Sequence, residues 1–146
     1  MTFELPCGEY VVSDDPGRLD RDLIHRWLSE SSYWAGGRTR ETVDRSLAHG
    51  SIGFGVYAPD GAMVGFARVV TDRATFGWLC DVFVIEVHRG RGLGKALMEA
   101  AVTHPDLRHL KRYLLATADA HGFYGQFGFA ALDNPERWMI RRGETA

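Results

Sequence analysis

The stretch Arg89-Gly90-Arg91-Gly92-Leu93-Gly94-Lys95 lies between an apolar run and an amphipathic segment. The run before it, Leu79 to Ile85, is rich in β-branched and aromatic residues, which predicts a strand. The segment after it places apolar residues on one face at helical spacing: Leu93, Ala96, Leu97, Ala100 and Ala101. Glycines let the backbone approach a ligand, and the unpaired N–H groups of a first helical turn point toward it. Together with three basic side chains, this arrangement predicts an anion site, and phosphate fits it best.

Spacing excludes two common phosphate loops. A Walker loop has four residues between its first glycine and Gly-Lys, and a Ser or Thr follows the lysine. Here three residues separate Gly90 from Gly94, and Ala96 follows Lys95. A dinucleotide-binding loop has the spacing G-x-G-x-x-G, whereas Gly90, Gly92 and Gly94 run G-x-G-x-G. Another kind of phosphate loop is therefore needed.

Two motifs of this chain resemble those of the GNAT family, the Gcn5-related N-acetyltransferases. Arg89-x-x-Gly92-x-Gly94 is similar to the family's coenzyme A pyrophosphate loop. About thirty residues downstream, the stretch from Ala120 to Phe129 resembles its A-x-x-F-Y-x-x-x-G-F signature. The resemblance implies acetyl-CoA as the donor, bound partly by main-chain groups of the strand before the loop. The residues to which it assigns coenzyme A binding are Phe83, Val84, Ile85, Arg89, Gly90, Arg91, Gly92, Leu93, Gly94, Lys95, Asp119, Phe123 and Tyr124.

Tyr124 is the candidate general acid. Attack of an amine on a thioester expels a thiolate, and a phenol of pKa about 10 can protonate a thiolate whose thiol has a pKa of about 8.5. In the resembled family, the tyrosine at this position reaches the coenzyme A sulfur. A lone tyrosine would otherwise be interpreted as a core residue with a satisfied hydroxyl. His121, one helical turn earlier, is either a proton relay or a surface residue at a helix start.

The sequence does not single out one residue as the general base that accepts the proton of the acceptor amine. Strand alternation places Trp78, Cys80 and Val82 on one face of their strand and Asp81 on the other. If the face of Cys80 lines the acceptor pocket, Asp81 points away from it and satisfies buried donors instead. Two alternatives for the proton acceptor therefore stay open: Asp81 and a water chain that leads to bulk solvent.

Acceptor recognition is expected in the N-terminal helices and their connecting loop. Tyr33, Trp34 and Arg38 lie on a glycine-containing loop that could cover an acceptor pocket, and Arg68 adds positive charge. With Cys80 as a pocket-lining residue, they are the candidate substrate-binding residues. Aromatics beside arginine indicate an acceptor that carries a carboxylate or another anion as well as its amine. The alternative is that tryptophans of this region pack the helices onto the sheet.

Composition is that of an ordinary globular protein. The chain has 146 residues, 45% of them hydrophobic and 25% charged, and its net charge of -2 gives no support to nucleic-acid binding. No apolar run is long enough to cross a bilayer, so no membrane role is expected. Two cysteines form no disulfide framework, which favours a cytoplasmic setting, and the six histidines show no metal-ligand spacing.

The order of elements predicts an α/β fold in one domain over 1–146. Helices are expected at Leu19 to Glu30, Thr39 to Ala48, Leu93 to Thr103 and Gly122 to Phe127. Strands are expected at Glu9 to Ser13, Phe54 to Ala58, Met63 to Val70, Phe76 to Ile85, Tyr113 to Thr117 and Arg137 to Arg141. The resemblance implies a mixed central sheet of six to seven strands with a splayed parallel pair, flanked by about four helices.

Two classes of function follow. The first is an acetyl-CoA-dependent N-acetyltransferase that acts on the primary amine of a small molecule by direct attack in a ternary complex; a peptide or protein amine is an alternative in the same class. The second is a non-catalytic module that binds acyl-CoA. A homodimer is an expectation from the resemblance alone.

Overall fold

The computed structural model describes residues 2–144, and their contacts divide the chain into two compact units. The first is Met1–Ala116 and the second is Thr117–Ala146. The expectation of one domain over the whole chain stays a prediction.

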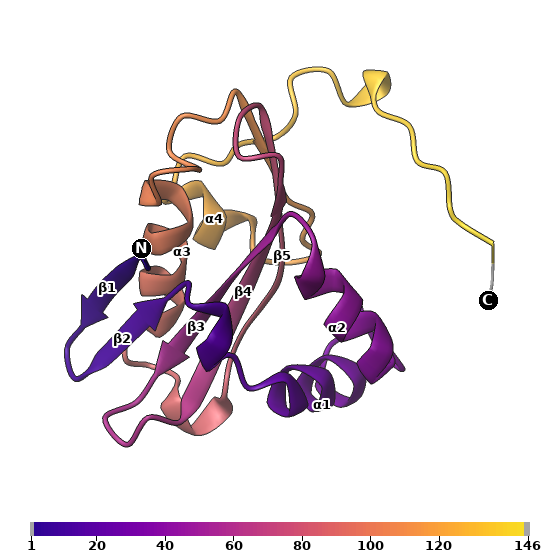
Figure 1. The fold of residues 1–146 in the computed structure, drawn as a ribbon. Coiled ribbons are helices and arrows are strands. Elements are labelled where there is room, and N and C mark those ends of the chain that lie inside the picture. Colours follow the sequence, from indigo (N-terminus) through magenta and orange to yellow (C-terminus); the bar gives the residue numbers. More distant parts are fainter. Residues whose placement is uncertain (1, 145–146) are drawn as a thin grey trace. The chain divides into compact units, whose positions relative to one another are not determined.

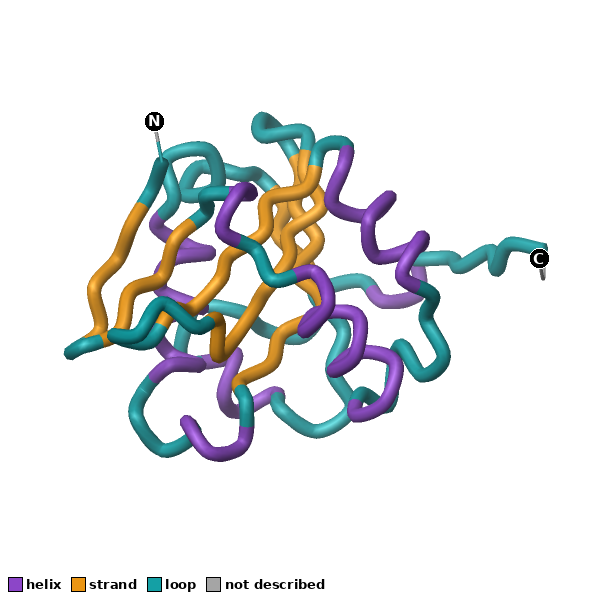
Figure 2. Tube along the Cα trace, turned by 60° about the horizontal axis from the view of Figure 1, so that its bottom comes forward, coloured by secondary structure: helices purple, strands orange, loops and turns teal. Residues whose placement is uncertain are grey.

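A mixed sheet of six strands, in the order β1-β2-β3-β4-β5-β6, forms the centre of the first unit (Figure 2). Neighbours from β1 to β5 are antiparallel, and β5 and β6 are parallel. This topology confirms the predicted α/β class with a mixed sheet. The strands are β1 Glu4–Cys7, β2 Tyr10–Ser13, β3 Ser51–Tyr57, β4 Met63–Thr71, β5 Phe76–Val84 and β6 Arg112–Leu114.

Helices cover both faces of this sheet. α3 (Leu93–Thr103) packs on strands β1 to β5, whereas α1 (Arg21–Ser31) and α2 (Arg40–Ala48) pack on each other and α2 also contacts β3 (Figure 1). Phe54 of β3 contacts His104 at the end of α3, and a side chain on the adjacent Gly53 would meet Leu19, just before α1, and Leu47 of α2. Because neighbouring strand residues point to opposite faces, α3 and the α1–α2 pair lie on opposite sides of the sheet.

The core on the α1–α2 side is aromatic and aliphatic. Its buried residues are Ile24, Leu28, Ala35, Val43, Tyr57, Met63, Phe66 and Phe83. Tyr57 folds back along its own strand, so that a Cβ at Gly55 would lie 2.4 Å from the Tyr57 hydroxyl. Glycine at position 55 is therefore needed for the Tyr57 ring to occupy this core.

Two differences from the sequence-based prediction concern strands. β1, with Pro6 inside it, was not expected; it is tolerated because β1 is the edge strand of the sheet, where a missing N–H costs little. The predicted strand Arg137 to Arg141 is wrong. Pro135–Arg137 forms a 3-10 turn instead, with the N–H groups of Arg137 and Trp138 donating back to Asn134 and Pro135. No strand follows in the described part of the second unit, to residue 144, because no extended partner within that unit supplies a ladder.

The second unit contains α4 (His121–Gly125) and the 3-10 turn η3 (Pro135–Arg137). The Thr117 hydroxyl accepts a hydrogen bond from the Ala120 N–H at 3.1 Å, which organises the turn before α4. A turn follows the end of α4, in which the Phe127 N–H donates to the Tyr124 carbonyl and Gly128 has a left-handed conformation with φ 92°.

Candidate active site

The predicted phosphate loop ends at the N-terminus of α3. Gly92 is the N-cap residue in the left-handed region, with φ 78°, and makes no side-chain cap. The first helical hydrogen bond runs from the Ala96 N–H to the Gly92 carbonyl at 3.0 Å. Among the described residues, no acceptor is assigned to the N–H groups of residues 93–95. This first turn is therefore an open set of donors at the positive end of an eleven-residue helix.

Contacts from two directions fix the backbone of this loop. Arg89 Nε donates to the Val84 carbonyl at 3.1 Å, which folds the loop back on the end of β5. From the β1–β2 hairpin, the Tyr10 hydroxyl lies 2.9 Å from Nδ1 of His88. The Cys7 thiol approaches the Gly92 carbonyl at 3.9 Å. No local sequence pattern predicts these supports, because Cys7 and Tyr10 are about eighty residues away along the chain.

The charged side chains of the loop stay in solvent. Arg89, Arg91 and Lys95 are all exposed. Exposed cations beside unpaired N–H groups are the donor set that a phosphate or pyrophosphate requires. The loop therefore fits the phosphates of coenzyme A, and the fit comes from its own backbone and charge.

β5 extends beyond its parallel neighbour. β6 pairs with β5 only from Phe76 to Trp78, whereas β5 continues to Val84. The far part of β5 therefore has a strand on its β4 side alone within the sheet. Ile85 uses both of its backbone groups, since its N–H donates to Val64 and its carbonyl accepts from His88. Of the three residues expected to bind pantetheine through the main chain, Ile85 is thus the least available.

Asp81 is the centre of a buried polar cluster. Its Oδ2 accepts from Arg38 Nη1 at 2.8 Å and from Arg68 Nε at 3.0 Å, and its Oδ1 accepts from the Trp34 indole N–H at 2.9 Å. Asp81 itself is 3% exposed. Burial alone would raise the pKa of Asp81, but Arg68, Trp34 and Arg38 outweigh burial and hold this pKa below its ordinary value. An occupied carboxylate of lowered pKa is a poor proton acceptor, which favours a structural role over that of general base.

A β-bulge directs Asp81 toward this cluster. Cys80 and Phe83 pair with Arg68 and Phe66 of β4, so two residues of β5 stand opposite one of β4. Asp81 lies in this bulge with φ 55°, a left-handed conformation that is uncommon for a residue with a side chain. Strand alternation predicted that Asp81 lies on the opposite face of its strand from Cys80, and thus points away from an acceptor pocket if Cys80 lines it. The structure instead brings Trp34, Arg38 and Arg68 onto Asp81.

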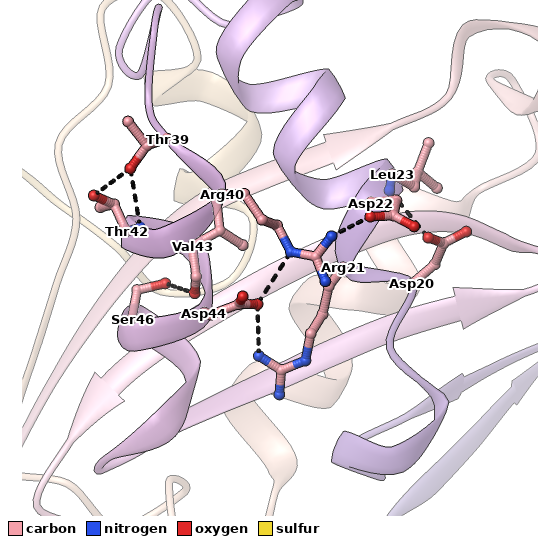
Figure 3. A network of polar contacts seen from close by, with 10 residues as sticks. All are labelled: Asp20, Arg21, Asp22, Leu23, Thr39, Arg40, Thr42, Val43, Asp44 and Ser46. Carbon is pink, nitrogen blue, oxygen red and sulfur yellow. Dashed lines mark hydrogen bonds and ion pairs between the residues drawn. The ribbon is translucent and has the colours of Figure 1, made fainter.

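The loop that carries Trp34 and Arg38 is held by its flanking helices. Ser32 accepts from the Ala35 N–H and donates to Leu28 of α1, and the Gly37 N–H donates to Ser29. Figure 3 shows ion pairs that join the two helices across their exposed side: Arg21 and Arg40 both contact Asp44, and Arg40 also contacts Asp22. Asp20 and Thr39 cap the first turns of α1 and α2. We call these ion pairs of Arg21, Asp22, Arg40 and Asp44 the α1–α2 clamp; by joining the two helices, they restrict the conformations of the loop between them.

Aromatic side chains line the same region. Trp27 of α1 stacks on Phe83 with ring centroids 4.3 Å apart, so this tryptophan packs the helix onto the sheet. Trp34 is 40% exposed and Tyr33 is 67% exposed, and their rings meet edge to face at 5.0 Å. Trp34 thus combines a hydrogen bond to Asp81 with an exposed ring.

Cys80 is half-buried, and burial raises the pKa of its thiol to about 11. A thiol of raised pKa is largely protonated at neutral pH, which favours a pocket-lining role for Cys80 over that of a nucleophile. Among the described residues, no group of three His, Cys, Asp or Glu side chains is arranged to hold a metal ion. Likewise, no helix between residues 2 and 144 has the length and apolar character to cross a membrane.

In the second unit, Tyr124 lies in the last turn of α4. Its N–H donates to Ala120, and its ring contacts Phe123 at 5.1 Å and Phe129 at 6.3 Å, both edge to face. The motif from Ala120 to Phe129 thus forms one local aromatic unit. Asp119 and His121 are exposed at the start of the helix.

Comparison with known proteins decides the family. The family model described as the Acetyltransferase (GNAT) family matches residues 21–129, more than half of the chain. The chain belongs to the GNAT family. It is an N-acetyltransferase, and members of this family generally use acetyl-CoA.

Individual relatives agree with this membership. A candidate acetyltransferase of Gibberella zeae is 31% identical, over 82% of this chain and 77% of that protein. The crystal structure of a candidate GNAT acetyltransferase from Xanthomonas campestris pv. campestris has a TM-score of 0.90 and 46% identity, covering 94% of this chain and 96% of that chain. A candidate acetyltransferase from Deinococcus radiodurans R1, at 21% identity and a TM-score of 0.71 over 94% of this chain and 91% of that one, shares the fold. The predicted GNAT membership and fold are confirmed.

Proposed function

We propose that this GNAT protein transfers the acetyl group of acetyl-CoA to the primary amine of a small molecule. The observation that carries the proposal is the N-terminus of α3, where open N–H groups, left-handed Gly92 and exposed arginines meet. Arg89, Gly90, Arg91, Leu93, Gly94 and Lys95 complete this phosphate loop, and Phe83 and Val84 offer main-chain groups of β5 to the pantetheine arm. Asp119 and Phe123 are proposed contacts from the second unit.

In the proposed reaction the amine nitrogen attacks the thioester carbonyl, the C–S bond breaks, and the sulfur leaves as a thiolate. Tyr124 donates its phenolic proton to that thiolate, a role supported by its motif and by the pKa values of phenol and thiol. The ammonium proton of the acceptor leaves through water, because Asp81 is occupied and has a lowered pKa.

The affinity of loop variants for acetyl-CoA tests the proposed phosphate loop. Replacing Gly92 by Val adds a branched side chain at φ 78° in the path of the ligand, and we expect titration calorimetry to show a loss of affinity of at least about tenfold. Gly94→Val tests the second glycine of the motif. Gly61→Val is the matched control, since Gly61 also has positive φ and open surroundings but lies in the β3–β4 hairpin. Retained binding in Gly92→Val and Gly94→Val would contradict the proposed phosphate loop.

The turnover of a Tyr124 variant tests whether Tyr124 is the general acid. Tyr124→Phe should lower kcat by about 100-fold or more, the usual contribution of general acid catalysis, and leave the Kd of acetyl-CoA unchanged. Free-thiol release with a panel of small amines and peptides measures turnover and shows which acceptors are used. An unchanged kcat would remove Tyr124 from the reaction. The proposed homodimer is tested separately by mass under native conditions.

A further inference from the structure

We propose that Arg38 and Arg68, positioned by Asp81, bind a carboxylate of the acceptor, so that the acceptor is an amino acid with an apolar or aromatic side chain. The inference rests on the proposed function and adds the class of the acceptor to it. The residues come from three distant parts of the chain: the loop between α1 and α2, strand β4 and strand β5.

The cluster of Arg38, Arg68 and Asp81 carries an excess of positive charge. Two guanidinium groups meet one carboxylate, which leaves a net charge of +1 in the cluster. The side chains of Arg38 and Arg68 are 21% and 13% exposed, whereas that of Asp81 is 1% exposed. Excess positive charge in a partly desolvated place favours the binding of an anion.

Both arginines also have N–H donors that Asp81 does not use. A guanidinium group has five N–H donors, and within residues 2–144 each of these arginines directs one nitrogen to Asp81 and none to any other acceptor. Among the described side chains, Tyr57 Oη is the one fully buried polar atom without a partner. The remaining nitrogens of Arg38 and Arg68 are therefore in reach of solvent, and two neighbouring guanidinium groups can bind a carboxylate.

Asp81 acts as the positioning residue. Its Oδ2 is shared by both arginines, which brings the two guanidinium groups to a common point. Its left-handed backbone at φ 55° is uncommon for a residue with a side chain, and a well-packed apolar cluster in place of all three charged groups could be at least as stable. A strained acid that orders two arginines is consistent with a binding role for those arginines.

The aromatic rings give the rest of the acceptor a surface. Trp34 is fixed through its indole N–H on Asp81 and still exposes 40% of its surface, and Tyr33 stands against it at 67% exposure. The cluster also lies close to the proposed donor site, because Asp81 is two residues from Phe83 along β5, about 7 Å at the rise of a strand. A single carboxylate would neutralise the cluster, whereas a phosphate dianion would reverse its charge.

Three acceptors that differ at the carboxyl position test this inference: phenylalanine, phenylalaninol and 2-phenylethylamine. Free-thiol release with acetyl-CoA gives kcat/KM for each, compared on the basis of the unprotonated amine. We expect phenylalanine to be preferred by at least about tenfold, the usual effect of a charge-assisted hydrogen bond. Equal values for the three acceptors would overturn the proposal, and so would a higher kcat/KM for 2-aminoethyl phosphate, assayed beside them as the phosphate-bearing amine.

Variants assign the preference to the arginines. Arg68→Gln and Arg38→Gln should each reduce the ratio of kcat/KM for phenylalanine to kcat/KM for 2-phenylethylamine toward one, while KM for acetyl-CoA changes by less than about twofold. Arg68→Lys should retain part of the preference. Arg45→Gln is the control, because Arg45 is exposed on α2 and its loss changes the net charge equally. If Arg68→Gln does not fold, the acceptor preferences of wild type and of Arg38→Gln still test whether an arginine binds the carboxylate. A preference that survives in both Gln variants would overturn the assignment.

Failure of the proposed function is separable from failure of this site. If no amine is acetylated, N-acetylphenylalanine and its amide are titrated against the protein and followed by the NMR signal of the Trp34 indole N–H. Tighter binding of the acid would retain the carboxylate site and reject the proposed reaction. Equal binding of the acid and the amide would reject the carboxylate site as well.

Discussion

Asp81→Asn is the most informative perturbation of stability. The variant keeps the size of the side chain, and asparagine tolerates the left-handed backbone at φ 55°. It removes the charge that Arg38 and Arg68 share and turns an amide N–H₂ or a weaker acceptor toward them.

The cost follows from burial. Breaking a buried ion pair by removing one partner costs about 3–5 kcal/mol. The lower end applies here, because both arginine side chains keep some contact with solvent, at 21% and 13% exposure. We therefore expect a loss of about 3 kcal/mol of unfolding free energy at pH 7. At about 2–4 °C per kcal/mol, the melting temperature falls by about 6–12 °C.

The effect should depend on pH. The folded-state pKa of Asp81 lies below its unfolded value of about 3.9, so its stabilisation is complete above that value and disappears as the pH falls through the folded pKa. Urea unfolding at pH 7 and at decreasing pH below 4 should thus show wild type and variant converging. Asp60→Asn, in the exposed β3–β4 turn, is the control. A loss under about 1 kcal/mol at pH 7, or a difference that does not change with pH, would refute the reasoning.

Three further predictions concern the frame around the site. Tyr57→Phe removes a buried hydroxyl without a partner, so calorimetry should find the variant as stable as wild type or up to about 1 kcal/mol more stable; clear destabilisation would show that the hydroxyl is satisfied. His104→Ala loses the contact of Nε2 with Asp14 at 2.8 Å and the hydrogen bond from the Asp106 N–H, and should cost about 2–4 kcal/mol in urea unfolding; a smaller cost than about 1 kcal/mol would contradict the burial argument. Arg40→Gln breaks only exposed ion pairs and should change the unfolding free energy by less than about 1 kcal/mol, with a larger change showing that the α1–α2 clamp is structurally important.

Local patterns in the sequence were sufficient for most helices and strands of the first unit and for the glycine loop that leads into α3. The apolar run before the glycine loop, the helical spacing after it and the Pro-Asp-Gly turn between β3 and β4 each act over a few residues, so they can be read without the fold. The same holds for the open first turn of α3, since unpaired N–H groups are a property of any helix start. GNAT membership followed from two such local motifs.

Long-range pairing decided the rest. Whether residues 137–141 form a strand depends on a partner backbone, which no pattern inside the segment reveals. The bulge at Asp81 depends on the register between β4 and β5, and one extra residue there changes which groups the carboxylate meets. Arg38, Arg68 and Trp34 were each candidates by residue type alone. Their common attachment to one buried acid became visible only in the tertiary structure, because contacts over 13 to 47 residues of sequence depend on how the sheet and helices pack.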